Sequence, residues 1–252
     1  MGAVLLILLL LTTYSFLTMN NTGVNVAKGI KDTFSNFFHM FSEPYSHRFT
    51  VWNALLEVLV TVGMAFLTTL FGAVIAIFLG LLSAQNLSSR ASGNIIKAVV
   101  SFIRAVPTVL WVLLFAVAAG LGSNAAVIGM TFHSVSYLTK AYSESFESLD
   151  KSVIEALKAS GANWWQIAFQ AVIPASSTYL LSWTFMRFEI NFTNAVAMGA
   201  AAGAGGIGFD LFMASGFYFD LREVGLIAYL VLAVAFILEI LSTRMKKKLM
   251  CA

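Results

Sequence analysis

Long stretches without a charged residue restrict the possible folds of this chain more than any other feature, and five of them anchor the predicted spans. They cover residues 1–27, 58–89, 105–139, 159–186 and 224–238. A membrane-spanning helix needs about 20 consecutive apolar residues. Over the whole chain only 11% of the residues are charged, whereas a soluble domain carries about 25%. The sequence therefore excludes a soluble globular enzyme and predicts an all-α, polytopic membrane protein.

About six membrane spans fit into these stretches. The stretch 105–139 is too long for one helix, and a turn signal with the sequence GLGSN at 120–124 divides it in two. Residues 1–51 then form an N-terminal span with an outer segment, and residues 52–252 form the main transmembrane domain. The predicted spans lie at about 3–19, 53–82, 99–120, 124–141, 167–190 and 222–242.

Basic residues in the C-terminal tail set the predicted orientation. Cytoplasmic segments of membrane proteins carry an excess of Lys and Arg, and the tail contains Arg244 and the run 246–248 of three lysines. With six spans, both termini are then expected in the cytoplasm. The first span follows no basic residue and precedes no A-x-A site, so we expect it to be retained rather than cleaved as a signal peptide.

An amphipathic segment at residues 24–42 lies outside the predicted spans. Its apolar residues recur at helical spacing, with Lys28, Lys31 and Asp32 mainly on the other side. The segment is too short and too charged to span a bilayer, so we expect a helix in the outer membrane interface. A packed loop is the alternative. The apolar residues are Ile30, Phe34, Phe37, Phe38 and Phe41.

The most informative segment lies between the fourth and fifth predicted spans. It combines a short amphipathic helix that ends at Gly161 with a second helix that starts before Pro174. Gly161 can adopt a positive φ and turn the chain sharply. A charged helical elbow in a small loop has little to pack on within its own chain. This segment therefore predicts docking to a partner.

The same segment resembles the EAA loop of ABC importer permeases. That loop has the pattern E-A-A, three residues, G, nine residues, I-x-L-P. Here Glu155, Ala156, Gly161 and Pro174 match, whereas Leu157, Ala171 and Ile173 are apolar exchanges. The resemblance implies a type I ABC importer permease fold with a cytoplasmic coupling helix at about 143–166. In that family the helix inserts into a groove on the ATPase, so Glu155 would face a basic residue there and Gly161 would allow the bend.

Residues 56–245 resemble the whole permease domain, and three segments within them resemble the phosphonate-type subfamily. These segments are RAVP at 104–107, RFEIN at 187–191 and GAGGIG at 203–208. The extra first span and the Phe-rich outer segment also fit that subfamily. The resemblance implies import of a small phosphorus oxyanion (a phosphonate, phosphite or phosphate) by alternating access. Methionine permeases share the glycine-rich block, so a methionine importer is the alternative.

The chain lacks the G-x-x-x-x-G-K-[ST] loop that binds nucleotide phosphates. It is therefore not expected to be an enzyme, and ATP hydrolysis would come from a separate subunit. In the resembled family, two permeases pair with two ATPases and receive substrate from an extracytoplasmic binding protein. The resemblance thus implies a homodimer in the cell membrane of a prokaryote, with ATP and Mg on the ATPase and no cofactor on this chain.

Polar and charged residues within the spans are the candidate pathway or gate residues. A charge at the centre of a span costs about 2.5–3.5 kcal/mol on insertion scales, so such residues are usually paired or functional. The candidates are Arg104, Pro107, Arg187, Glu189 and Asn191. The alternatives are that Arg104 reaches to the cytoplasmic membrane edge, and that internal salt bridges to Glu57 or Glu239, and not a pathway role, account for the charge of Arg187.

A group of glycines follows the fifth span. They are Gly199, Gly203, Gly205, Gly206 and Gly208. Small residues let helix backbones approach closely, so we expect a packed turn near the outer end of the pathway. The G-x-G-x-x-G spacing within this group does not indicate a dinucleotide fold, because no βαβ unit surrounds it.

Other kinds of chemistry receive little support. The single cysteine, Cys251, and the scattered histidines predict no metal site, and a net charge of +3 predicts no nucleic-acid binding. Asp210 and Ser215 lie close to intramembrane protease motifs, but each motif is incomplete. An intramembrane enzyme is therefore a remote alternative. We expect His133 to make a local hydrogen bond within its own span.

Overall fold

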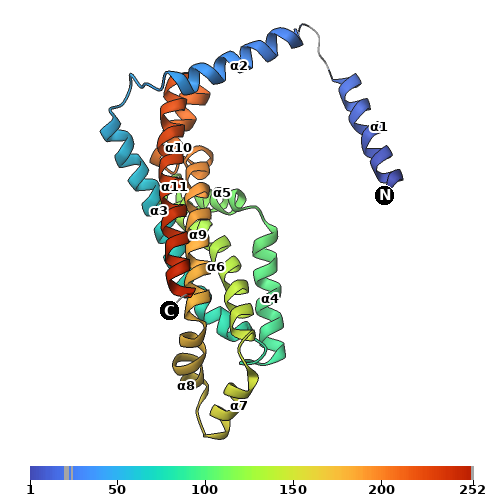
Figure 1. Cartoon of the computed structure of the whole chain (residues 1–252), viewed down its shortest axis with the longest axis vertical. Coiled ribbons are helices and arrows are strands. Elements are labelled where there is room, and N and C mark those ends of the chain that lie inside the picture. Colours follow the sequence, from blue (N-terminus) through green and yellow to red (C-terminus); the bar gives the residue numbers. More distant parts are fainter. Residues whose placement is uncertain (20–22, 24, 251–252) are drawn as a thin grey trace.

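The computed structural model describes residues 1–19, 23 and 25–250, and that part of the chain forms helices and no strands. The predicted all-α fold is thereby confirmed. Cys251 lies outside the described residues. Most helices form one elongated bundle, with α2 lying across one end and α7 and α8 at the opposite end (Figure 1).

The helices follow one another along the chain with short connections. They are α1 Gly2–Thr18, α2 Val26–Ser42, α3 Val51–Ser83, α4 Arg90–Ala105, α5 Thr108–Ala119, α6 Ser123–Glu147, α7 Lys151–Ala159, α8 Trp164–Gln166, α9 Ile173–Ala202, α10 Gly206–Phe212 and α11 Leu221–Met250. Two π-helical segments, Ile167–Val172 and Met213–Phe217, precede α9 and follow α10.

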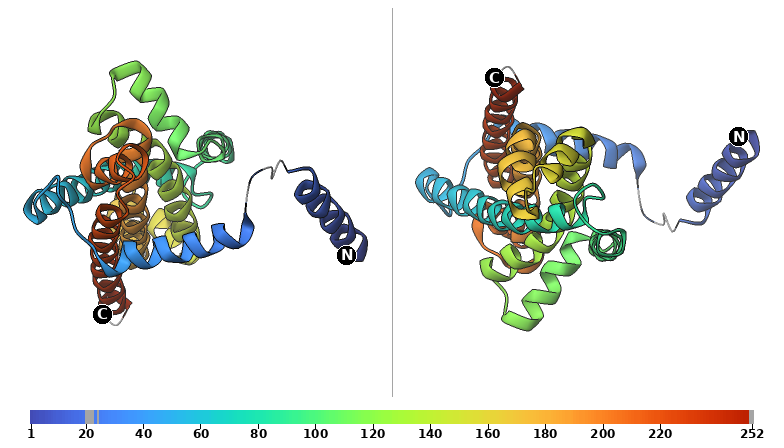
Figure 2. Two further views of the ribbon diagram at one scale, coloured as in Figure 1. Left: turned by 90° about the horizontal axis from the view of Figure 1, so that it is seen from above. Right: turned by 90° about the horizontal axis from the view of Figure 1, so that it is seen from below.

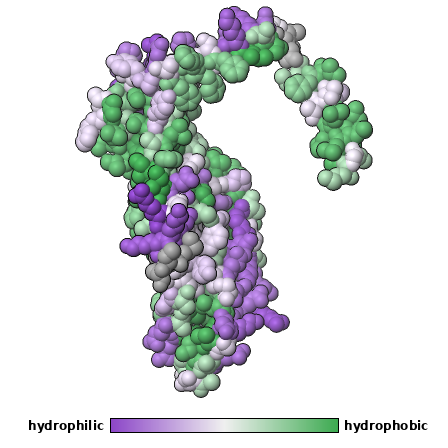
Figure 3. All heavy atoms as spheres, viewed as in Figure 1, coloured by the Kyte–Doolittle hydropathy of each residue, from purple (hydrophilic) through white to green (hydrophobic). Residues whose placement is uncertain are grey.

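Within the described residues, two helices are long and apolar enough to cross a membrane, namely α3 and the Leu221–Lys248 part of α11. Two bent pairs also qualify if each pair is one span. These pairs are α4 with α5, and Trp164–Ala202 with Gly206–Phe217, which is bent by 49°. Hydrophobic residues dominate the surface over α1 and over the half of α3 nearer to α2, whereas hydrophilic residues gather along α4 and near α7 (Figure 3).

The span predicted at 99–120 is not one continuous helix. The chain there forms two helices, α4 and α5, bent by 87°. Pro107 has no backbone N–H and disfavours the helical conformation of the residue before it. Val106 accordingly adopts an extended conformation, with φ −86° and ψ 126°. The helix also begins earlier than predicted, at Arg90, where the Ser89 side chain caps it by accepting from the Ser92 N–H.

Three other helices end later than predicted, whereas the glycine turn lies where it was expected. Helix α11 continues to Met250, past the predicted end at 242. Helix α6 continues to Glu147, past the predicted end at 141, and α9 continues to Ala202, past 190. Gly120 and Gly122 separate α5 from α6 with φ values of 90° and 139°. The α6 extension carries Glu144 and Glu147, which a search for charge-free stretches excludes. The α9 extension carries no charge, but Arg187 and Glu189 separate it from the charge-free stretch before it.

The amphipathic segment forms helix α2, and not a packed loop. The Asn25 side chain caps the helix by accepting from the Lys28 N–H at 3.1 Å. The end of α2 is attached to α11, where the Tyr229 hydroxyl donates to the Phe41 carbonyl at 2.8 Å. In views from above and from below, α1 lies apart from all other helices (Figure 2). Each of its residues is exposed.

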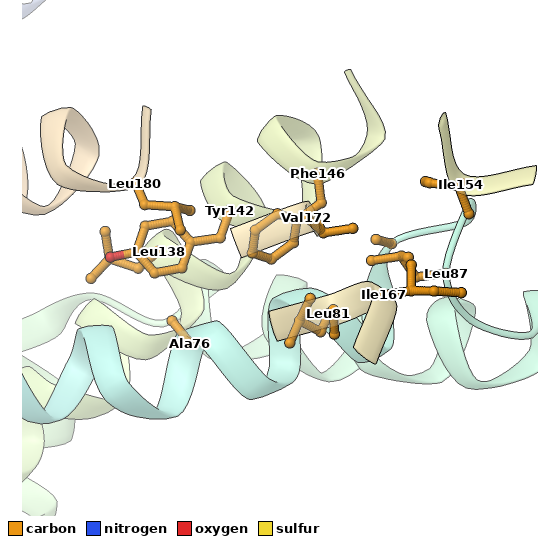
Figure 4. Packing of buried hydrophobic residues seen from close by; sticks show 12 residues of the cluster. Ala76, Leu81, Leu87, Leu138, Tyr142, Phe146, Ile154, Ile167, Val172 and Leu180 are labelled. Atoms are coloured by element: carbon orange, nitrogen blue, oxygen red, sulfur yellow. The ribbon is translucent and has the colours of Figure 1, made fainter. Parts of the chain in front are cut away.

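One apolar cluster joins the helices of the bundle to the elbow that contains α7. Leu138, Tyr142 and Phe146 of α6 pack there against residues of α3, α7 and the Ile167–Val172 segment (Figure 4). Ile154 of α7 is 3% exposed and belongs to this cluster. The elbow is therefore packed against the bundle rather than loosely tethered to it.

Small residues allow the closest helix contacts. A Cβ atom added at Gly129 of α6 would lie 2.5 Å from the Cα atom of Val112 in α5. Two backbones in such contact leave no room for a side chain between them. Gly63 of α3, in contrast, has nothing within 4 Å of an added Cβ atom.

We expect Gly129→Ala to destabilise the protein by about 1–3 kcal/mol, because overpacking a tight contact forces backbone shifts. Gly63→Ala is the matched control, since it makes the same exchange inside a helix but in open space. Thermal unfolding of both variants in detergent would be compared with the unchanged protein. Equal melting temperatures for the two variants would contradict the tight α5–α6 contact.

Candidate functional site

The elbow at one end of the molecule places the EAA-like residues on the surface. Helix α7 is capped by Asp150, whose side chain accepts from the Ser152 N–H at 2.9 Å. Glu155 and Ala156 are exposed, while Leu157 is half-buried. The helix thus turns its apolar side to the bundle and presents Glu155 to the surroundings.

Gly161 ends α7 in the conformation that the sequence pattern predicts. Its φ is +83°, its N–H donates to the Lys158 carbonyl, and the Ala162 N–H donates to the Leu157 carbonyl, both at 3.0 Å. These two bonds define a Schellman motif, which requires a left-handed residue at this position. Asn163 then starts α8 with a capping box that includes Gln166. Pro174 lies in the first turn of α9.

Two contacts join the elbow to the connection between α3 and α4. The Trp164 indole N–H donates to the Leu87 carbonyl at 3.0 Å. The Asn86 amide donates to the Phe146 carbonyl at the end of α6 at 2.8 Å. A displacement of the elbow would therefore be transmitted to this connection.

Glu147, the last residue of α6, forms a third contact of this kind. Its Oε1 accepts from the Lys97 Nζ of α4 and from the Gln85 N–H, each at 2.9 Å, and from the Ser143 hydroxyl at 3.4 Å. Burial raises the pKa of the Glu147 carboxyl, but the bonds from Lys97 and Gln85 outweigh this effect. The net pKa lies below its ordinary value.

A buried polar junction in the middle of the bundle contains Arg187. Its side chain is enclosed, with 2% exposure of the residue. The guanidinium Nε donates to the Ser134 hydroxyl at 3.1 Å, and Nη2 donates to His133 Nδ1 at 3.0 Å. The Tyr137 ring centroid lies 5.2 Å from the guanidinium carbon. Arginine is always a donor, so His133 Nδ1 carries no proton in this arrangement.

The ion pairs to Glu57 or Glu239 are not formed. In the described part of the chain, the salt bridges involve Arg48, Arg222, His39, Lys97 and Lys140, and no carboxylate lies within 4.0 Å of Arg187. The expectation that His133 bonds within its own helix holds for its carbonyl, which accepts from the Ser136 hydroxyl at 2.9 Å, but not for its side chain. Its partner is Arg187 on α9, because α6 and α9 pack side by side.

Asn191 extends the junction to a third helix. Its Nδ2 donates to the Thr69 hydroxyl of α3 at 2.8 Å and to the Ser134 hydroxyl of α6 at 3.0 Å. The structure thus brings Arg187 and Asn191 together, one helical turn apart on α9. Glu189 lies on another side of the helix and is half-exposed.

The sequence prediction omitted Thr69, His133 and Ser134 from this junction. Their partners lie on other helices, so no local pattern links them. One feature could have identified the facing surfaces, namely the four-residue spacing of Arg187 with Asn191 and of His133 with Tyr137. Residues at this spacing share one face of a helix.

Arg104 and Pro107 lie at the break between α4 and α5. Arg104 is half-buried in the last turn of α4. Arg104 thus lies on α4, whereas Arg187 lies on α9 and bonds to His133.

The glycine group forms the connection where α10 packs against α9 and α3. Gly203 ends α9 in a left-handed conformation with φ 57°, and Gly205 has φ 77°. A Cβ atom at Gly199 would lie 2.7 Å from the Phe209 backbone nitrogen, and one at Gly208 would clash with Val196. Gly206 lies against Thr61 of α3, whose hydroxyl accepts from the Ile207 N–H at 3.0 Å.

Residues 76–248 match the family described as binding-protein-dependent transport system inner membrane component. One relative is the phosphate-import permease protein PhnE of Mycolicibacterium smegmatis, 31% identical over 60% of this chain and 29% of its own length. Another is the phosphite transport system permease protein PtxC of Stutzerimonas stutzeri, 28% identical over 74% of this chain and 68% of its own. The chain thus spans less than a third of the first of these relatives.

Methionine permeases are similar as well. The methionine import system permease protein MetP of Bacillus subtilis is 31% identical over 61% of this chain and 71% of its own length. Among solved structures, an inward-facing MetNI methionine ABC transporter chain superimposes with a TM-score of 0.73. It is 19% identical and covers 81% of this chain and 99% of that one. This likeness establishes the fold.

The Glu147 contact predicts a pH-dependent stability. Because its pKa is lowered in the folded state, the stabilisation is complete at neutral pH and is lost as the pH falls through the folded-state pKa. We expect Glu147→Gln to lower the melting temperature at pH 7 and to have a smaller effect in acid.

Glu144→Gln is the matched control for that measurement. Glu144 lies on the same helix but forms a looser, more exposed pair with Lys140 at 3.7 Å, and exposed pairs contribute little. Melting curves of the three proteins between neutral and acidic pH would show the difference. A Glu147→Gln deficit that is independent of pH would contradict the charge-assisted contact.

Proposed function

Because the chain belongs to the family of binding-protein-dependent transport system inner membrane components, we propose that it imports a compact phosphorus oxyanion. It is a membrane-embedded transport permease of the ABC importer class. Phosphonate, phosphite and phosphate are the substrates that we consider first. Its relatives named for phosphate and phosphite transport support this choice.

The observation that carries the substrate proposal is the enclosed Arg187. A buried charge without a counter-ion is costly, and in the described residues no carboxylate pairs with Arg187. The guanidinium presents a planar set of donors that matches oxyanions. An anion that reaches this level of the bundle would replace His133 and Ser134 as the acceptor.

Methionine is the second candidate substrate. The similarity to methionine permeases favours it, and the carboxylate of an amino acid also suits an arginine. Methionine differs from phosphorus oxyanions in its ammonium group and its apolar side chain. In the described part of the chain, the junction around Arg187 offers no carboxylate for the ammonium group, which favours the oxyanion.

The elbow around α7 is the proposed docking site for the ATPase. Glu155 is exposed on α7, and the Schellman motif at Gly161 sets the angle between α7 and α8. We propose that two copies of this chain form the pathway and that each docks one ATPase subunit. ATP and Mg would be bound by the ATPases. The elbow and both termini would then lie in the cytoplasm of a prokaryote, and a binding protein would deliver substrate on the other side.

The contacts of the elbow suggest how ATP binding acts on the pathway. Closure of the ATPases would draw the two elbows together. Trp164, Asn86 and Glu147 would pass this movement to the start of α4 and to α6. Helix α6 carries His133 and Ser134, so the movement would reach the junction around Arg187. This sequence corresponds to alternating access by rigid-body rotation.

Charge reversal at Glu155 tests the docking proposal. We expect Glu155→Lys to abolish most co-purification of the ATPase and to reduce uptake at least about tenfold, as expected when a charge-assisted contact becomes repulsive. Asp32→Lys is the matched control, because Asp32 is an exposed carboxylate on α2 at the opposite end. Unchanged ATPase binding by Glu155→Lys would refute the assignment.

The substrate proposal is tested by the ATPase activity of the reconstituted complex with its binding protein. We expect stimulation by a phosphonate, phosphite or phosphate and none by methionine. Arg187→Gln should reduce the stimulated rate about tenfold, whereas Thr193→Ala, an exposed change on the same helix, should not. Stimulation by methionine alone would overturn the substrate but leave the transport class intact.

A further inference from the structure

A cavity separate from the Arg187 junction lies between α3, α4 and α6. Its volume is about 310 Å³, at the lower end of the range for small-ligand sites. Its lining includes Ser83 at the end of α3 and Glu147 at the end of α6, just before α7. Its polar lining residues are Ser83, Lys97, Ser101, Arg104, Thr139, Lys140, Ser143, Glu144 and Glu147.

The charges around this cavity do not cancel. Three cations and two carboxylates line it. Lys97 is paired with Glu147 at 2.9 Å, and Lys140 with Glu144 at 3.7 Å. Arg104 remains without a carboxylate within 4.0 Å in the described part of the chain. The cavity therefore has an excess positive charge that is localised on Arg104.

A buried hydroxyl in the cavity wall has no partner. Thr139 is 1% exposed, and its Oγ1 forms no hydrogen bond. Other hydroxyls of the same helix bond to the carbonyl four residues earlier, as Thr131 does at 2.6 Å and Ser145 at 2.8 Å. A buried polar atom without a hydrogen-bond partner destabilises the protein, so the Thr139 hydroxyl is a candidate ligand contact.

We propose that this cavity binds one compact oxyanion, with Arg104 supplying the charge and the Thr139 and Ser101 hydroxyls donating hydrogen bonds. The inference rests on the proposed function, which makes the α7 end cytoplasmic. The cavity is then the last binding site before release into the cytoplasm. A cytoplasmic oxyanion could reach the same site from the other direction.

The Lys97–Glu147 pair connects this site to the elbow. Glu147 lines the cavity and also bonds to Gln85 and Lys97. A movement of α7 that shifts the end of α6 would alter both the cavity wall and the pairing of Lys97. Release of Lys97 from Glu147 would add a second cation to the site. Anion binding would thus respond to the position of the elbow.

Equilibrium binding of methylphosphonate tests the site directly. The full-length permease would be titrated in nanodiscs together with its ATPase and without nucleotide. We expect Arg104→Gln to weaken binding about tenfold, since it removes a charge-assisted hydrogen bond. Thr139→Val keeps the shape of the side chain and should weaken binding by a smaller factor. Arg244→Gln, an exposed arginine on α11, is the matched control.

Three results would overturn the proposal. They are the absence of methylphosphonate binding to the unchanged protein, equal affinity of Arg104→Gln and the unchanged protein, and equal loss in Arg104→Gln and Arg244→Gln. Elution as an intact complex in size-exclusion chromatography would verify that each variant is folded. This binding assay needs no transport. Its result is therefore independent of the substrate panel that tests the proposed function, so failure of the site and failure of the function can be distinguished.

Two arms in proteoliposomes identify the source of the anion. In the first arm, the binding protein delivers methylphosphonate. Reduced uptake by Arg104→Gln then identifies the cavity as a binding site on the transport pathway. In the second arm, methylphosphonate is added only on the ATPase side. If this addition slows transport by the unchanged protein but not by Arg104→Gln, the site binds a cytoplasmic anion that inhibits transport. Either result supports the site, and identical behaviour of both proteins in both arms contradicts it.

Discussion

The amide of Asn191 holds three helices at one level of the bundle, and the positions of the other functional groups depend on it. Its contacts to Thr69 and Ser134 join α9 to α3 and α6. In the apolar interior of a membrane protein, such side-chain bonds fix the rotation of helices that apolar packing alone would leave variable. Ser134 also accepts from Arg187, so the same junction that aligns the helices orients the buried guanidinium.

One part of the bundle holds the proposed anion-binding residues, and another part connects them to the elbow and would transmit its movements. Arg187 and the cavity with Arg104 lie within the bundle, whereas Glu155 lies on the exposed side of the elbow. Between them, the apolar cluster around Tyr142 and Phe146 packs α3, α6 and α7 together. Dense packing of this kind passes displacements on instead of absorbing them. The hydrogen bonds of Trp164 to Leu87 and of Glu147 to Lys97 would direct these displacements to the α3–α4 connection and to α4.

The two N-terminal helices, α1 and α2, lie outside the main bundle (Figure 1). Helix α2 joins the bundle at its end through Tyr229 and through the ion pair of Glu43 with Arg222. The apolar residues Phe34 and Phe38 remain 74% and 70% exposed, as expected for a helix whose apolar face meets lipid. The exposed apolar surface of α1 is likewise suited to the bilayer. Contacts with α11 therefore place α2, whereas every residue of α1 is exposed.

The sequence by itself determined the all-α membrane fold, the glycine turn before α6 and the elbow at Gly161. These features depend on local properties, namely the lack of charges over about 20 residues and the tolerance of glycine for positive φ. The tertiary structure alone decided the partners of Arg187 and the place of the unpaired Thr139 hydroxyl in the cavity that Arg104 also lines. Residues 53 to 122 positions apart meet in the polar junction. Such pairings depend on the rotation and depth of each helix, which are set by side-chain packing among several helices and not by any local pattern.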